Sequence, residues 1–241
     1  MELKKASEIE VRDYCLKALV YGRPGTGKTR SLRTAPKPLI VIDTDRGMLS
    51  LRDESDVLFV SVDYDSDSPN PMAWVKVEEA VNEVVKIPEI RTVALDSLTT
   101  ISSAALKRAL FLNRHLTVTP SLPDYMRQVK MLEDLITKVI SAKKHIVVTA
   151  HEQYEKNEIT GQVWCLPSVV GKVAYSLPVW FDEVYRAEVV RNEKGEMSYR
   201  WMLRSDTVYS CKSRLAAGKM EDIFAPQDFR GLAERCGVKL E

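Results

Sequence analysis

The stretch that decides the fold is Gly22-Arg23-Pro24-Gly25-Thr26-Gly27-Lys28-Thr29, which fits the pattern Gly-x-x-x-x-Gly-Lys-Ser/Thr. An apolar run at residues 16–21 precedes it, and a helical pattern at residues 28–34 follows it. A glycine-rich turn between a buried strand and a helix is a building unit of sheets with crossover helices. The stretch therefore predicts an α/β fold.

Apolar runs and helical patterns continue to alternate along the chain. Further strands are expected at residues 39–43, 57–62, 92–96 and 145–149. Helices are expected at residues 72–86, 98–114 and 123–142, with a proline-containing loop at 117–123. Strands buried on both faces read as nearly continuous Val, Ile and Leu, as these do. The pattern predicts a mainly parallel sheet with helices on both faces.

The second half of the chain has a different pattern. The runs 182–190 and 198–204 flank Asn192-Glu193-Lys194-Gly195, a hairpin turn signal, and 208–212 is a further strand candidate. Residues 226–236, followed by Gly237, predict a short terminal helix. An antiparallel C-terminal extension of the sheet is therefore expected. Without a clear linker, we expect a single domain over residues 1–241, with its core at about 14–236.

Composition excludes several classes of protein. The 241 residues are 45% hydrophobic and 29% charged, which is typical of a globular chain with a full core. No apolar run approaches the roughly 20 residues of a membrane helix, and the N-terminus lacks the apolar core of a secretory signal. The four scattered cysteines form no Cys-x-x-Cys pair, so we expect reduced thiols, no structural zinc and a cytoplasmic location.

Residues 22–29, called the phosphate loop below, carry the most specific chemistry. Glycines let backbone N–H groups turn towards an anion, and the helix that follows points its positive end at the same place. The lysine reaches the terminal phosphates and the threonine hydroxyl ligates Mg²⁺. The alternative, a turn with a stray lysine, arises by chance in about one sequence in a hundred. The candidate nucleotide-binding residues are Gly22, Arg23, Pro24, Gly25, Thr26, Gly27, Lys28, Thr29 and Arg30.

A second motif supplies a carboxylate. Residues 92–96 form an apolar run that ends in Asp96, and a helical pattern begins at Leu98. Such a carboxylate at a strand end holds Mg²⁺ beside a phosphate loop, although an Asp that caps a helix looks the same in sequence. Thr29 and Asp96 are therefore the candidate metal-binding residues. Ser97 stands where many ATPases have a glutamate base, so a base is expected elsewhere.

Further motifs resemble RecA-like ATPases. Residues 39–45, Leu-Ile-Val-Ile-Asp-Thr-Asp, are similar to the RecA-family strand whose acidic end activates water. The resemblance assigns this role to Asp45, where the family usually has Glu, with Asp43 as the second candidate. The alternative is that both aspartates shape the turn into Gly47.

Two more elements belong to this resemblance. Residues 145–152 look like the family strand that ends in a sensor of the γ-phosphate, which implies that role for His151 or Glu152. A strand-end histidine with only a packing role is the alternative. Cys211-Lys212-Ser213-Arg214 resembles the Lys-x-Arg element that such ATPases insert into a neighbouring subunit's site, where cations stabilise phosphate charge. A solvated basic pair is the alternative.

The resemblance covers about residues 14–236 and is strongest to small phage-type RecA-like ATPases of single-strand annealing and recombination. It implies ATP hydrolysis with Mg²⁺, a homo-oligomeric ring or filament, and single-stranded DNA as partner in the cytoplasm, the host's if phage-encoded. No membrane partner is expected. A DNA-translocating motor and a nucleotide-dependent protein switch remain alternatives.

The distribution of charge is uneven. The net charge is +1, yet residues 103–144 contain eight Lys or Arg and three acids, while residues 43–67 contain eight acids and two bases. Residues 152–177, expected as a mobile loop, combine aromatics and lysines in a way that suits single-stranded nucleic acid. A solvated basic helix face and a core tryptophan are the alternatives. The candidate DNA-binding residues are Arg108, Arg114, Lys156, Trp164 and Lys172.

Overall fold

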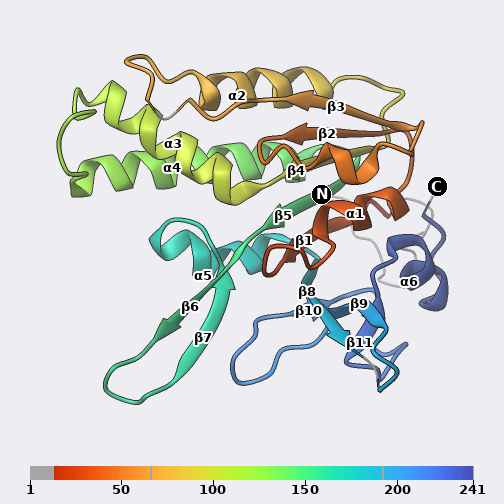
Figure 1. Ribbon diagram of the computed structural model, residues 1–241. Helices are drawn as coiled ribbons and strands as arrows, with labels where there is room; N and C mark the ends of the chain where they lie inside the picture. The colour runs from red at the N-terminus through yellow and green to blue at the C-terminus, as the bar shows by residue number, and fades with distance from the viewer. Residues whose placement is uncertain (1–13, 66, 192, 241) are drawn as a thin grey trace, which may run out of the picture.

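A twisted sheet runs through the molecule in the computed structural model, which describes residues 14–65, 67–191 and 193–240 (Figure 1). The strands are β1 Lys17–Tyr21, β2 Leu39–Asp43, β3 Val57–Ser61, β4 Thr92–Asp96, β5 His145–Ala150, β6 Glu152–Lys156, β7 Val163–Pro167, β8 Glu183–Arg191, β9 Met197–Met202, β10 Lys212–Ser213 and β11 Phe224–Pro226. The helices are α1 Lys28–Ser31, α2 Ala73–Val84, α3 Leu98–Leu112, α4 Leu122–Ser141, α5 Gly171–Trp180 and α6 Phe229–Arg235.

The main sheet has the order β11-β9-β8-β1-β5-β4-β2-β3, with β10 paired to β8. Within this order, every neighbouring pair from β8 across to β3 is parallel. Strands β9 and β10 pair antiparallel with β8, and β11 pairs antiparallel with β9. The α/β prediction is thus confirmed, including the antiparallel extension at the C-terminal end. Because parallel strands end at one edge, β1, β2, β4 and β5 bring their carboxyl ends together, and that edge carries the site.

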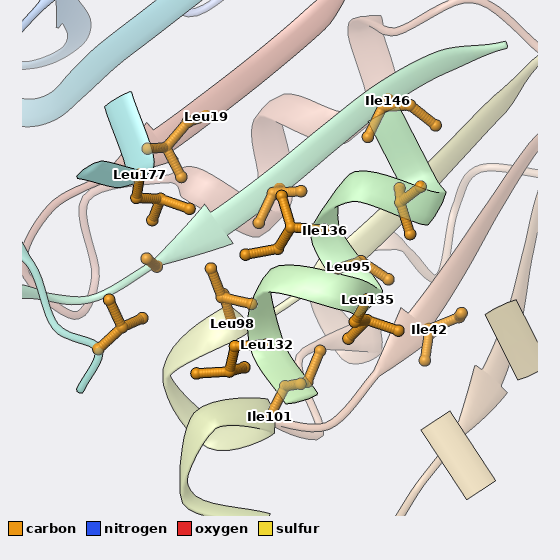
Figure 2. Packing of buried hydrophobic residues seen from close by; sticks show 14 of the residues in the cluster. Leu19, Ile42, Leu95, Leu98, Ile101, Leu132, Leu135, Ile136, Ile146 and Leu177 are labelled. Carbon is orange, nitrogen blue, oxygen red and sulfur yellow. The ribbon is translucent and has the colours of Figure 1, made fainter. Parts of the chain in front are cut away.

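Helices cover both faces of the sheet, as expected. On one face, Leu19, Ile42, Leu95 and Ile146 point from the strands towards α3, α4 and α5 (Figure 2). The other face packs against a second cluster, which includes Leu32 after α1 and an aromatic group of Tyr185, Trp201 and Phe229. In that group Tyr185 and Trp201 stack with ring centroids 4.9 Å apart. Burial of β1, β2, β4 and β5 on both faces explains why these strands lack polar alternation. The same expectation for residues 57–62 was wrong, because β3 is the last strand of the sheet and leaves Leu58 and Phe59 more than half exposed.

A buried carboxylate fixes the connection between α3 and α4. Asp124 accepts hydrogen bonds from the backbone N–H and the hydroxyl of Ser121, at 2.7 and 2.6 Å, which forms a capping box at the start of α4. Asn113 Nδ2 and His115 Nδ1, which follow α3, contact the same carboxylate at 2.6 and 3.0 Å. The Ser121 hydroxyl and these partners lower the pKa of Asp124. One ionised side chain therefore joins the two helices.

Two expectations for the second half were wrong. Residues 208–212 form no strand of that length, because Asp206 Oδ1 accepts from the N–H groups of Val208 and Tyr209 and holds a turn; only β10 remains. Residues 152–177 are no loop: β6 and β7 form a hairpin and α5 follows, as Figure 1 shows. The predicted β8–β9 turn begins at Asn192, which lies outside the described residues, as do residues 1–13.

No helix in the described part of the chain is both long enough and apolar enough to cross a membrane.

Candidate functional site

A pocket of about 580 Å³ opens at the carboxyl edge of the parallel strands, within the range of roughly 300–1,000 Å³ typical of small-ligand sites. It brings together residues of the phosphate loop, the segment after β2, the end of β4 and the end of β5. Its lining residues are Pro24, Gly25, Gly27, Lys28, Thr29, Arg30, Asp45, Gly47, Ser50, Asp96, His151 and Tyr199. The structure thus unites most of the residues that the sequence assigned to nucleotide and metal.

The phosphate loop wraps the side chain of Lys28. Its Nζ donates hydrogen bonds to the carbonyls of Gly22 and Arg23, at 2.9 and 2.8 Å, and the Thr26 hydroxyl donates to the Arg23 carbonyl at 2.8 Å. Burial lowers the pKa of Lys28, while the nearby carboxylate of Asp96 opposes this. A phosphate bound in the loop would favour the charged ammonium further. The loop therefore has the shape and the cation of an anion site.

Asp96 lies directly beside the phosphate loop. The Thr29 hydroxyl donates to Asp96 Oδ2 at 2.8 Å, and the hydroxyl of Thr149 on β5 donates to Oδ1. Burial raises the pKa of Asp96, which is 2% exposed. A hydroxyl and a buried carboxylate facing one another form the oxygen donor set that Mg²⁺ prefers, and a cation between them would offset the cost of burying the charge. The residues present therefore fit a magnesium ion.

The two aspartates after β2 have different surroundings. Asp43 is buried, and its Oδ1 accepts from the N–H groups of Asp45 and Gly47 at 3.2 and 3.1 Å, so it shapes the turn. Asp45 faces the pocket, where His151 Nε2 lies 3.2 Å from its Oδ2 and the Thr100 hydroxyl donates to its Oδ1. Burial would raise the pKa of Asp45, but these hydrogen bonds outweigh it and hold the pKa at about 2. Asp45 is therefore ionised and only weakly basic.

Gly47 forms the wall between this segment and the metal-site residues. A Cβ at position 47 would lie 3.1 Å from Thr29 Cγ2 and 3.3 Å from Asp96 Oδ2. The backbone after β2 therefore packs against the residues that fit magnesium, and the close approach depends on glycine.

Glu152 and Arg23 lie beside the pocket and contact one another. The side chain of Glu152 is 2% exposed; its Oε2 lies 2.9 Å from Arg186 Nε, and its Oε1 lies 3.1 Å from Arg23 Nε. Burial would raise the pKa of Glu152, but the contact with Arg186 outweighs it and lowers that pKa. Tyr154 on β6 donates to the same carboxylate at 3.1 Å. Glu152 thus links the phosphate loop to β6, while His151 is the residue of the two that faces the pocket.

Lys212 and Arg214 lie at the sheet edge and do not line the pocket of their own chain. The Lys212 ammonium is 3.4 Å from the carbonyl of Val179, and Arg214 pairs with Asp182. The backbone N–H of Arg214 is held by the buried carboxylate of Glu183 at 3.0 Å. Their role towards a neighbouring subunit stays a prediction.

The candidate DNA-binding residues fall into two groups. Arg108 lies near the end of α3 and Arg114 just after it, and Arg108 Nη1 donates to Asn70 Oδ1 at 3.0 Å. Lys156 and Trp164 lie on the hairpin, and Lys172 is exposed on α5. Trp164 is half-buried and packs against the main core, as the alternative reading allowed.

Several site residues were not found by sequence reasoning. Thr100 and Thr149 contact the two carboxylates of the pocket, and Tyr199 and Gln227 contact the phosphate loop from the C-terminal half. Thr149 could have been recognised from the sequence, since it is a polar residue near the end of a buried strand. Tyr199 and Gln227 carry no local motif and come to the loop only through the topology of the sheet.

Comparison with known proteins gives one family and a set of similar structures. The family described as AAA domain matches residues 15–223. Similar solved structures include a KaiC-like protein, PH0186, from the hyperthermophilic archaeon Pyrococcus horikoshii OT3, with 12% identity, 78% of this chain and 77% of that chain covered, and a TM-score of 0.40. Another is an ATPase of the type III secretion system of pathogenic bacteria, with 14% identity, 76% and 56% covered, and a TM-score of 0.45. No curated protein matches the chain.

Proposed function

The chain belongs to the AAA domain family and is a P-loop ATPase with a RecA-like fold, and from this premise we propose that it uses ATP to act on single-stranded DNA in recombination or strand annealing. The ATPase part follows from the family, the phosphate loop and Asp96. The DNA part rests on the path of the chain from the pocket into the hairpin.

The pocket residues divide the work of ATP hydrolysis. Lys28 and the backbone N–H groups of the phosphate loop would bind the phosphates. Thr29 and Asp96 would hold Mg²⁺, which neutralises phosphate charge when bound. Asp45, with a pKa of about 2, stays ionised and orients water more readily than it accepts a proton. His151 holds the Asp45 carboxylate at 3.2 Å and so fixes its direction.

One observation carries the DNA proposal: the hairpin begins directly at the pocket. Strand β5 ends at Ala150, His151 lines the pocket, and β6 begins at Glu152. In Figure 1 the hairpin extends away from the body of the molecule. Glu152 also pairs with Arg23 of the phosphate loop. A movement in the pocket on nucleotide binding would therefore reach the hairpin covalently through His151, and through the ion pair between Arg23 of the phosphate loop and Glu152.

The hairpin surface suits single-stranded nucleic acid. Tyr154 is 45% exposed, with the Arg23 guanidinium carbon 5.9 Å from its ring centroid, whereas Trp164 packs against the core. Lys156 is exposed near the tip, with its Nζ 4.0 Å from Glu158 Oε2, and Lys172 is exposed at the start of the adjacent α5. An exposed aromatic ring beside lysines binds bases by stacking and the backbone by charge, with little dependence on sequence. The DNA site proposed is thus centred on Tyr154 and Lys156.

The proposal includes assembly of the protein into a homo-oligomer. Lys212 and Arg214 lie at an edge outside their own pocket, where a neighbouring copy could receive them. Cations delivered to the γ-phosphate would stabilise charge that develops during hydrolysis. Hydrolysis would then depend on assembly.

The test is binding of a fluorescein-labelled single strand, followed by anisotropy without nucleotide, with ADP and with a non-hydrolysable ATP analogue. We expect the tightest binding with the analogue, and loss of that enhancement in Lys28→Ala. The double variant Tyr154→Ala/Lys156→Ala should weaken binding about tenfold. Its control, Tyr64→Ala/Lys76→Ala, changes the same residue types in the loop after β3 and on α2, and should bind normally.

Equal binding in all nucleotide states, or an unaffected hairpin variant, would contradict the proposal. No DNA binding with intact ATP hydrolysis would favour a protein switch. Unwinding of duplex DNA fuelled by ATP would favour a motor.

A further inference from the structure

A second cavity, of about 600 Å³, adjoins the pocket. The two share Gly27, Arg30 and Tyr199, so they lie side by side at the end of the phosphate loop. One wall is the polar side of α1 and the turn after it, with Arg33 among its residues. The other wall is the C-terminal half, with Gln227 among its residues. Apart from Gly27 of the phosphate loop and Arg30, the residues of these walls have no role in the phosphate or metal chemistry described above.

Tyr199 stands at the junction of the two cavities. It lies on β9 and is 46% exposed, which leaves its ring accessible. A Cβ at Gly27 would lie 2.9 Å from Tyr199 Cδ1, so the ring contacts the loop backbone at this point. Gly27 has a φ of 85°, which also favours glycine. An aromatic side chain is thus held against the exit of the phosphate loop.

Gln227 fixes this arrangement. Its Nε2 donates to the carbonyl of Thr26 at 2.8 Å and to that of Arg200 at 3.2 Å. Arg200 follows Tyr199 on β9, so a single amide ties the phosphate loop to the strand that carries the ring. Gln227 is therefore a positioning residue.

The direction of a bound nucleotide follows from these walls. Phosphates in the loop have Thr29, Asp96 and Gly47 on one side, where packing is tight. The space that continues beyond Gly27 is the second cavity. Resting on the ATPase function, we propose that the second cavity binds the nucleoside and that its base stacks on Tyr199. Arg30 and Arg33 line the same space, and a guanidinium group can stack on the face of a purine.

The polar groups of the cavity predict weak discrimination between bases. The Asp228 carboxylate accepts from the N–H of Gly231 at 3.0 Å as the cap of α6. The Thr34 hydroxyl donates to the Ser31 carbonyl and accepts from the N–H of Phe229. Because the Thr34 hydroxyl and one Asp228 oxygen already have partners within the protein, we expect the face of the base to contribute more to recognition than its edge. ATP and GTP should then bind within about tenfold of one another, as stacking is tolerant of the base.

Calorimetry with ATP, GTP and inorganic tripolyphosphate tests the assignment. Tyr199→Ala should weaken both nucleotides about tenfold, or about 1.4 kcal/mol, and leave tripolyphosphate binding unchanged. Tyr199→Phe keeps the ring and should bind as the wild type does. Tyr125→Ala removes an equally accessible tyrosine from α4 and serves as the control.

The outcomes separate this inference from the ATPase function. If Tyr199→Ala binds ATP normally, or loses tripolyphosphate equally, the nucleoside does not stack there and the inference fails. If the wild type binds neither ATP nor tripolyphosphate, the phosphate loop itself has been misassigned. A preference for ATP or GTP far above tenfold would contradict recognition by stacking. It would indicate that the cavity forms hydrogen bonds with the edge of the base.

Discussion

The parallel and antiparallel parts of the sheet serve the site in different ways. Strands β1, β2, β4 and β5 end at one edge and place Lys28, Asp45, Asp96 and His151 around the pocket. The antiparallel strands bring Tyr199 and, after β11, the amide of Gln227 to the side of the phosphate loop. The charged chemistry thus belongs to the parallel part, while the antiparallel part holds the loop in place and, by our inference, receives the nucleoside.

The largest effect should follow from Lys28→Ala in the parallel part. Loss of the ammonium from the centre of the phosphate loop should lower ATP hydrolysis about a thousandfold, because no other lysine lines the described pocket. A phosphate-release assay measures this. Lys86→Ala, on an exposed turn after α2, is the control and should retain the wild-type rate. Near-normal hydrolysis by Lys28→Ala would contradict the assignment of the charged chemistry to the parallel part of the sheet.

The next effect concerns Glu183, at the junction of the two parts. Its Oε1 accepts from the N–H groups of Arg214 and Leu215 at 3.0 and 2.9 Å, and Tyr185 donates to its Oε2 at 2.7 Å. Glu183→Ala leaves these donors buried without an acceptor and should lower the free energy of unfolding by about 3 kcal/mol. Glu183→Gln keeps one acceptor and should lose less. Urea denaturation distinguishes the two variants.

The burial of Glu183 also predicts that the stability of the fold depends on pH. Burial raises the pKa of Glu183 above its usual 4.5. Its contribution to stability is therefore full below pH 4.5 and declines as the pH rises through the raised value. Since Gln does not titrate, the melting temperature of Glu183→Gln relative to wild type should rise from acidic to neutral pH. A constant difference would show that Glu183 is not perturbed.

The smallest effect is expected for Asp45→Asn. A carboxylate with a pKa of about 2 is a poor proton acceptor at neutral pH, so we expect only about a tenfold loss in kcat, with ATP affinity retained. Stopped-flow phosphate release and calorimetry measure the two quantities. A loss of a thousandfold would mean that Asp45 takes the proton of water and that bound nucleotide changes its pKa.

The sequence predicts the parallel part far better than the rest. The bounds of β2 and β4 match the expected ranges, because strands buried on both faces leave an unbroken apolar run. Helix α5 was missed, because Gly171 and Pro178 both read as helix breakers. Burial of Val173, Ala174 and Leu177 forms the helix in spite of them. Tertiary packing overrides local preference there.

The site divides in the same way. The phosphate loop and Asp96 are recognisable because their chemistry requires fixed spacing, and the structure places the Thr29 hydroxyl 2.8 Å from Asp96. The pairing of Glu152 with Arg23 and Arg186 has no sequence pattern, since one partner lies in the phosphate loop and the other within β8. Tyr199 is equally invisible, as an exposed tyrosine in a strand is common.

The contacts that assemble around the phosphate loop join residues far apart along the chain. Thr29 meets Asp96 across 67 positions, Arg23 meets Glu152 across 129, and Thr26 meets Gln227 across 201. Loops of such length close slowly, and none of these contacts can form early during folding. Nucleotide binding consequently reports on completion of the sheet from β11 to β4. In a refolding experiment it should appear with the last kinetic phase, after helical signal has returned.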